Sequence, residues 1–167
     1  MYLRNAWYVA ATSAEISHSP LARLLLEEPV VLWRTVDGVP VAFEDRCCHR
    51  HAPLSAGKII GDRLQCGYHG LTFDATGTCI EVPSQTRVPL DARVRTYPLV
   101  ERYNWVWVWM GDPEVADENL IPDTYWHDSP DWCAVSDKFS VECHYQSLID
   151  IQLDNTHSRF VHPDTLG

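Results

Sequence analysis

Two short boxes of metal-binding side chains constrain the fold of this chain more than any other feature. The first holds Cys47 and His49, the second holds Cys66 and His69, and 16 residues separate His49 from Cys66. Each box offers one thiolate and one imidazole. A [2Fe-2S] cluster with two cysteines on one iron and two histidines on the other needs this mixture. The spacing predicts two hairpin loops that grip such a cluster between them.

The pattern also has a zinc interpretation, because two Cys and two His can form a structural zinc site. Zinc motifs usually pair Cys with Cys and His with His at short spacing, whereas each box here mixes the two. The mixture favours a histidine-ligated cluster of the Rieske type. Cys48 and His51 form a competing Cys-x-x-His pair inside the first box. Cys47 and His49 fit the spacing better, so they are the predicted ligands.

Length and charge narrow the class of protein. The chain has 167 residues, enough for one domain with a sizeable core, and a net charge of -10, which disfavours nucleic acid as a partner. No secretory signal is evident at the start of the chain. No apolar run approaches the ~20 residues of a membrane helix. These features predict a cytoplasmic protein with reduced thiols.

Residues 1–112 are predicted to form short antiparallel strands in a small barrel or sandwich. Asp37-Gly38 lies between the apolar runs 30–34 and 39–43, a strong hairpin signal because both turn residues tolerate positive φ. Residues 21–28 fit either a helical turn or a strand. The run from Trp105 to Trp109 is predicted to be a core strand.

The composition changes at Gly111. Residues 111–131 are acidic and contain three prolines, so they are predicted to be a linker. Residues 145–155 place Leu148, Ile149, Gln152 and Asn155 at roughly helical spacing. The predicted domains are therefore 1–112, which binds the cluster, and 113–167, a linker and the beginning of a second domain.

A second group of metal-binding residues lies in that C-terminal part. Asp154 is followed by His157 three positions later and by His162 five positions after that. Residues three apart share a helix face, and a short break would bring His162 round to His157. Two His and one carboxylate are the ligands of mononuclear non-haem Fe(II) oxygenases. Helix capping or simple surface exposure is the structural alternative. Iron is favoured because oxygen activation needs single electrons, which a cluster can deliver.

These motifs resemble those of the α subunits of Rieske non-haem iron oxygenases. The similar branch is the phthalate-dioxygenase-like one, which includes vanillate O-demethylase and dicamba monooxygenase, and the likeness is to their N-terminal portion. Four stretches carry the resemblance: 4–10, 67–71, 106–112 and 154–167. It implies a mainly β Rieske domain, with small antiparallel strands and two cluster-binding hairpin loops, followed by the start of an α+β catalytic domain.

The resemblance implies roles for individual residues. Cys47, His49, Cys66 and His69 would hold the cluster. His157 and His162 would hold the mononuclear iron, whose third ligand, an Asp in the family, would lie beyond residue 167. Asp154 would act in catalysis by bridging a cluster histidine of one subunit to an iron histidine of the next, which implies a homotrimer.

Two departures from the family pattern are visible, and one difference separates the chain from another class of Rieske protein. Cys48 stands where the family usually has Pro, and Ile151 stands where it commonly has Asn. Ala52 and Tyr68 stand where the Rieske proteins of respiratory complexes carry a disulfide. This last difference points away from the membrane-complex type.

The activity implied by the resemblance is that of a terminal oxygenase component. Such an oxidoreductase would receive electrons from NAD(P)H through a flavin and iron-sulfur reductase, and would use O2 to oxidise an aromatic acid. O-demethylation of a vanillate-like methoxybenzoate is the reaction most directly implied. A stand-alone Rieske ferredoxin is the alternative, although it would need neither Asp154 nor the two C-terminal histidines. A third possibility is a chain that folds its cluster domain only, and no oxygenase activity is expected of these 167 residues alone.

Overall fold

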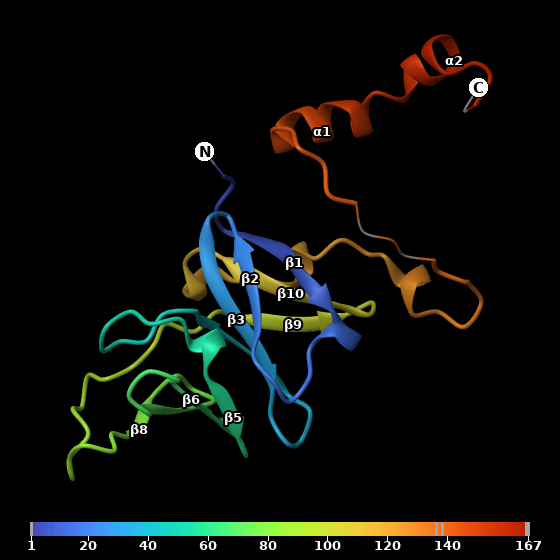
Figure 1. Ribbon diagram of the computed structural model, residues 1–167. Coiled ribbons are helices and arrows are strands. Elements are labelled where there is room, and N and C mark those ends of the chain that lie inside the picture. The colour runs from blue at the N-terminus through green and yellow to red at the C-terminus, as the bar shows by residue number, and fades with distance from the viewer. Residues whose placement is uncertain (1, 136, 138, 166–167) are drawn as a thin grey trace. The chain divides into compact units, whose positions relative to one another are not determined.

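The computed structural model describes residues 2–135, 137 and 139–165 (Figure 1). The chain divides into two compact units, Met1–Ala134 and Val135–Gly167. In the described residues, the first unit contains ten strands in three antiparallel sheets, and the second contains only short helices. The expectation of a mainly β cluster domain built from small antiparallel strands is confirmed. The short helices do not by themselves identify a catalytic domain.

The first sheet has the order β1-β10-β9 and contains the tryptophan-rich run. Its strands are β1 (Ala6–Thr12), β9 (Leu99–Arg102) and β10 (Trp105–Met110). Val106, Val108 and Trp109 of the central strand are at most 1% exposed. Trp109 also meets Trp7 edge to face, with the ring centroids 5.3 Å apart. Both faces of β10 are therefore covered, as predicted for a core strand.

The second sheet is an antiparallel meander of β2 (Leu21–Leu25), β3 (Glu28–Arg34) and β4 (Pro40–Glu44). The ambiguous segment 21–28 thus begins as a strand. Gly38 has φ +82°, and its N–H donates to the carbonyl of Thr35 at 3.0 Å. The predicted hairpin is confirmed, because glycine adopts this left-handed conformation at no steric cost.

The third sheet builds the base of the cluster loops. Its order is β5-β6-β7-β8, with β5 (Lys58–Ile60), β6 (Arg63–Gln65), β7 (Thr72–Asp74) and β8 (Cys79–Glu81). Leu64 and Phe73 pair across β6 and β7 and are fully buried with Leu54 of the 3-10 turn η2 (Leu54–Ala56). Each such side chain contributes about 1.5–3 kcal/mol of burial free energy. The loop between β6 and β7 is therefore held at both ends by a packed core.

The acidic stretch after Gly111 is part of the first unit and packs against the rest of it. The indole N–H of Trp7 donates to the carbonyl of Asp117 at 2.7 Å, and the amide of Asn104 donates to the carbonyl of His127 at 2.7 Å. Three 3-10 turns shape this stretch: η3 (Pro113–Val115), η4 (Glu118–Leu120) and η5 (Tyr125–His127). The predicted domain boundary at residue 112 stays a prediction.

The second unit contains α1 (Tyr145–Leu153), η6 (Asn155–His157) and α2 (Ser158–Val161). The predicted helix ends at Leu153, because Asp154 leaves helical geometry with φ -110° and ψ 86°. Every residue of α1 is exposed. No helix in the described parts of either unit has the length and apolar character needed to cross a bilayer.

Candidate iron-sulfur and iron sites

The first cluster loop is closed by its own backbone. The N–H of Cys47 donates to the carbonyl of Ala52 at 2.9 Å, and the N–H of His51 donates back to the carbonyl of Cys47 at 3.0 Å. His51 has φ +54°, so it occupies the left-handed region at the turn. The buried carboxylate of Asp45 accepts the N–H and the hydroxyl of Ser55, at 2.6 and 2.5 Å, and thereby ties the start of the loop to the segment that follows it.

The second loop repeats this arrangement. The N–H of Cys66 donates to the carbonyl of Leu71 at 2.8 Å, and the N–H of Gly70 donates to the carbonyl of Cys66 at 3.1 Å. Gly70 has φ +77°. Cys66 is thus the counterpart of Cys47, and Gly70 is the counterpart of His51. The competing histidine of the first box sits at the turn position that a glycine fills in the second.

The two matching thiols face each other in the interior. Cys47 and Cys66 are 2% and 3% exposed, and Cys66 is near enough to raise the pKa of Cys47. All six cysteines of the chain are free. Burial raises the pKa of Cys47 to about 12, although the N–H of His49 acts in the opposite direction. The metal-free thiol is therefore protonated at neutral pH, and iron binding must displace its proton.

Two imidazoles lie on the solvent side of the thiols. The rings of His49 and His69 are both exposed, with centroids 4.8 Å apart and planes at 63°. The donors are thus sorted into a thiol pair and an imidazole pair, which fits a cluster whose two irons each take two protein ligands. A tetrahedral zinc site would instead gather four donors round one ion. Among the described residues no three His, Cys, Asp or Glu side chains are placed to hold a single metal ion.

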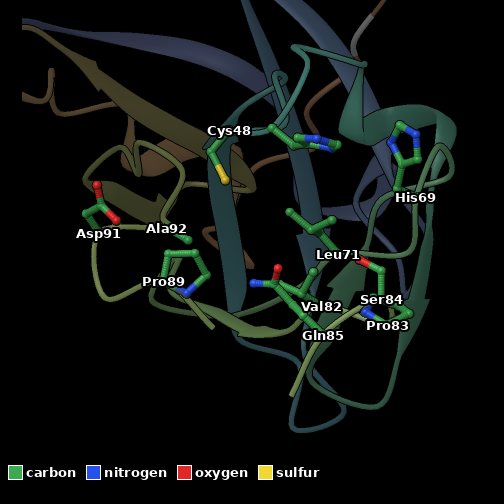
Figure 2. A pocket seen from close by; sticks show the side chains of 11 residues that line it. Cys48, His69, Leu71, Val82, Pro83, Ser84, Gln85, Pro89, Asp91 and Ala92 are labelled. Carbon is green, nitrogen blue, oxygen red and sulfur yellow. The ribbon is translucent and has the colours of Figure 1, made fainter. Parts of the chain in front are cut away.

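A pocket of about 620 Å³ opens beside the imidazole pair. Cys48, His49 and His69 line it on the loop side, and residues between Val82 and Ala92 form the other wall. Figure 2 shows Cys48 and His69 at opposite sides of this pocket, with Leu71 between them. Cys48 is exposed, whereas Cys47 is buried. The two neighbouring thiols of the first box therefore occupy different environments.

The prediction from sequence missed two features of this site. The link between Asp45 and Ser55 leaves no local pattern, because the two residues are joined only by the folded loop. Tyr68 rests on His69 with ring centroids 3.9 Å apart, and it is 62% exposed. The sequence signal for this contact was the position of Tyr68 between Cys66 and His69 in the second box.

The second predicted group also comes together. Asp154, His157 and His162 line one pocket of about 450 Å³ with Asp150 and Ile151. The two histidine rings are 5.7 Å apart between centroids, with planes at 74°. Two imidazoles facing one pocket fit two ligand positions of a mononuclear iron site. No described residue completes a three-donor set there.

Asp154 organises the turn that presents His157. Its Oδ1 accepts the N–H of Thr156 at 3.1 Å and the hydroxyl of the same residue, and these bonds lower the pKa of Asp154. The Nδ1 of His157 lies 2.5 Å from the carbonyl oxygen of Asp154. With the proton on Nδ1, the ring donates to that carbonyl and Nε2 keeps its lone pair for a metal. Asp154 therefore caps the turn that follows it, which is the structural alternative that the sequence suggested.

Comparison with known proteins identifies the family. A sequence profile described as the Rieske [2Fe-2S] domain matches residues 6–98, more than half of the chain. The chain belongs to the Rieske [2Fe-2S] domain family. Within it, the chain corresponds to the N-terminal part of the α subunits of Rieske oxygenases, as the relatives below show.

Three relatives illustrate this correspondence. The iron-sulfur subunit of the toluene-4-sulfonate monooxygenase system of Comamonas testosteroni is 47% identical over 100% of this chain and 48% of its own length. The vanillate O-demethylase oxygenase subunit of a Pseudomonas species is 41% identical over 100% of this chain and 47% of its own. A crystal structure of dicamba monooxygenase bound to dicamba matches 97% of this chain and 49% of its own, with a TM-score of 0.91 at 43% identity. The chain spans about half the length of the curated relatives it matches.

Proposed function

We propose that this chain forms the N-terminal part of the terminal oxygenase component of a multicomponent Rieske oxygenase. The observation that carries the proposal is the sorted donor set of the first unit, a buried thiol pair beneath an exposed imidazole pair. A pocket with two further histidines in the same chain supports it. The named relatives are themselves oxygenase or monooxygenase components.

In this proposal, Cys47 and Cys66 hold one iron of the cluster and His49 and His69 hold the other. Bound there, a Rieske cluster accepts and releases one electron at a time. The protein excludes water from the sulfur side, where both cysteines are buried, and leaves the imidazole side exposed. Backbone hydrogen bonds close both loops and hold their cysteines in place.

We further propose that His157 and His162 are two ligands of a mononuclear Fe(II), and that 113–167 begins the α+β catalytic domain. The third ligand would come from a residue of the full-length enzyme beyond 167. Asp154 would bridge this iron site to a cluster histidine of a neighbouring subunit in a homotrimer. A carboxylate that accepts N–H bonds from two ligand imidazoles orients both rings.

The proposed reaction is O-demethylation of a vanillate-like methoxybenzoate. In balance, O2, NAD(P)H, a proton and the methoxy compound give the phenol, formaldehyde, water and NAD(P)+, with electrons delivered by a flavin and iron-sulfur reductase. The names of the vanillate and dicamba relatives support oxidation of an aromatic acid. Another relative is named for toluene-4-sulfonate, so an arylsulfonate is the second substrate to assay.

The alternative function is that of a Rieske ferredoxin that carries electrons without catalysis. The C-terminal histidines discriminate between the two. An electron carrier has no use for the pocket of His157 and His162, yet the similarity to oxygenase components extends over the whole chain. This similarity favours the oxygenase.

Anaerobic reconstitution followed by metal analysis and EPR tests the proposed cluster. We expect two irons and two acid-labile sulfides per chain, with the low average g-value of a histidine-ligated cluster. Stoichiometric zinc without sulfide would refute the cluster.

A substitution in the full-length protein tests the iron site. His157→Ala is expected to leave the EPR signal of the cluster intact and to abolish oxygenation, since one of two proposed iron ligands is lost. Oxygenation that persists in this variant would remove His157 from the iron site.

A further inference from the structure

The two cluster loops are held relative to each other without a covalent link. All six cysteines lie among the described residues and are free, so no disulfide joins the loops. The 3-10 turn η2 lies between the loops in the chain. Its first residue, Leu54, is fully buried in the core cluster that also contains Cys47 and Cys66. A turn anchored in this way can set the separation of the loops if it contacts both of them.

Ser55 joins the turn to the first loop. Its backbone N–H and its hydroxyl donate to Asp45 at 2.6 and 2.5 Å, one to each carboxylate oxygen. Asp45 stands two residues before Cys47 and is 8% exposed. Hydrogen bonds to a carboxylate are roughly twice as strong as those between neutral groups. The start of the first loop therefore cannot shift away from the turn without breaking two strong bonds.

Two glycines bring the other side of the turn against the second loop. A Cβ atom at Gly57 would lie 2.1 Å from the carbonyl oxygen of Gln65, and one at Gly67 would lie 2.6 Å from the carbonyl oxygen of Ala56. Real Cβ atoms almost never come within 3.0 Å of such a neighbour. Neither glycine has a positive φ, so the lack of space, and not the backbone conformation, requires glycine at both positions.

The close approach of these glycines places backbone directly against backbone. Gly67 follows Cys66, and Gln65 precedes it. The turn therefore contacts the second loop on both sides of its cysteine, with no side chain between them that could adjust. Residues 54–57, which we call the brace, are thus bonded to the first loop through Ser55 and packed on the second loop through Gly57 and Ala56.

We propose that the brace holds the two cluster loops at the separation that the cluster requires, and that Asp45 and Gly67 are its positioning residues. This inference rests on the proposed cluster ligands and deepens the proposed function of that site. Neither residue is a proposed ligand, and each acts through the cysteine near it. Groups that support metal ligands typically change metal affinity when they are lost. The two links are in series, so a break in either one frees one loop from the other.

Release of iron to a chelator, followed by visible absorbance and EPR, tests the brace in the reconstituted full-length protein. Gly67→Ala forces the loop and the turn apart. It should speed iron release by about 10- to 100-fold and broaden the EPR spectrum of the cluster that remains, since the ligand positions become heterogeneous.

The matched control is Gly61→Ala in the turn between β5 and β6, at the opposite end of β6 from the second loop. Gly61 has φ +55°, and a Cβ atom there would meet nothing within 4 Å. This variant strains the backbone without touching the brace. It should lower the urea midpoint of unfolding but leave the EPR spectrum and the rate of iron release close to those of the wild type.

Two substitutions of Asp45 separate position from charge. Asp45→Ala removes both acceptors of Ser55 and should speed iron release. Asp45→Asn keeps an oxygen for the N–H of Ser55 and offers an amide N–H to its hydroxyl, so it should restore most of the wild-type behaviour. If Asp45→Asn releases iron as fast as Asp45→Ala, the carboxylate acts through its charge and the positioning role fails.

The double variant Asp45→Ala, Gly67→Ala tests whether the two links form one brace. Because the links are in series, the double variant should release iron no faster than the more affected single variant. If the two accelerations multiply instead, each loop is held independently and the proposal is overturned.

Equal acceleration of iron release by Gly67→Ala and Gly61→Ala would also overturn the proposal, because general destabilisation would then explain both. If Gly67→Ala does not fold, Ser55→Ala decides the matter. It removes only the hydroxyl bond to Asp45, and it must release iron faster than Gly61→Ala for the brace to stand. A wild-type protein that assembles no cluster would overturn the proposed function itself, so the two failures are distinguishable.

Discussion

The two candidate metal sites of this chain are held in contrasting ways. In the first unit, the thiols of Cys47 and Cys66 are 2–3% exposed above a packed core, and each loop is closed by two backbone hydrogen bonds. In the second unit, His157 ends η6 and His162 directly follows α2, and neither element contains a buried residue. The first site is therefore shaped by its own unit, whereas the second depends on one capped turn.

The contrast indicates how each site should respond to substitution. Loss of a donor in the first unit removes a ligand from a framework that is otherwise intact. Changes around the second site act on a turn held by Asp154 and Thr156, with no core beneath it. At the first site, loss of a metal ligand should therefore be distinguishable from unfolding of the loop. At the second site, loss of the charge of Asp154 should be distinguishable from loss of its cap on the turn.

The largest expected effect is at the thiol pair. Cys66→Ser should abolish assembly of the cluster, because a hydroxyl is a poor replacement for a thiolate ligand. Visible absorbance and EPR after reconstitution measure this loss. Cys48→Ser is the control and should assemble the cluster normally. If Cys48→Ser loses the cluster and Cys47→Ser keeps it, the choice between the neighbouring thiols is wrong.

Asp154→Asn in the full-length enzyme is expected to have the next largest effect. Asn caps a helical turn as well as Asp does, so this variant keeps the turn and loses only the charge. Electron transfer from the cluster to the second site should slow by about 10- to 100-fold, the usual cost of losing a group that orients metal ligands. Single-turnover kinetics measures the rate. If only Asp154→Ala is slow, the residue acts as a cap and not as a bridge.

Asp45 tests how firmly the first loop is anchored. Asp45→Ala leaves the N–H and hydroxyl of Ser55 without their acceptor inside the protein, and should lower the free energy of unfolding by about 1–3 kcal/mol. Urea denaturation measures the change. Asp131→Ala, at an exposed carboxylate, should stay within about 0.5 kcal/mol of the wild type. Equal effects of the two variants would contradict the anchoring role.

The smallest effect is expected at the ion pair of Arg34 and Glu101, far along the chain from either site. Two hydrogen bonds from Arg34, at 2.6 and 3.0 Å, lower the pKa of Glu101. A lowered folded-state pKa means stabilisation that is present above the unfolded-state pKa and lost as the pH falls through the folded-state pKa. Glu101→Gln should therefore cost up to about 1 kcal/mol at pH 7, since the pair is partly exposed.

The control for that prediction is the same comparison of wild type and Glu101→Gln at acid pH. Below the folded-state pKa of Glu101, the wild-type carboxyl is neutral, and the two proteins should unfold with similar free energies. A difference that stays constant from neutral to acid pH would show that the charge of Glu101 contributes nothing.

Local sequence signals predicted the features that depend on neighbouring residues. Asp37-Gly38 predicted its hairpin, in which Gly38 alone of the two adopts a positive φ, and the spacing from Asp154 to His162 anticipated a shared pocket. Residues 21–28 stayed ambiguous, because their strand is decided by pairing of 21–25 with β3. The packing of the acidic stretch on Trp7 was missed, since hydrogen bonds between distant segments have no periodicity.

The matched backbone frames of the two loops have a consequence for how such a protein can diversify. Counting from each cysteine, the second position is His49 in one loop and Tyr68 in the other, and the third is Arg50 and His69. If His49 and His69 are ligands, each loop has two positions that could carry a ligand, and only one of them does. The positions without a ligand are Arg50 and Tyr68, and Tyr68 packs against the ring of His69. The same backbone frame can therefore present its ligand from either position, and the residue at the other position can support the ligand ring, as Tyr68 does, or face solvent, as Arg50 does.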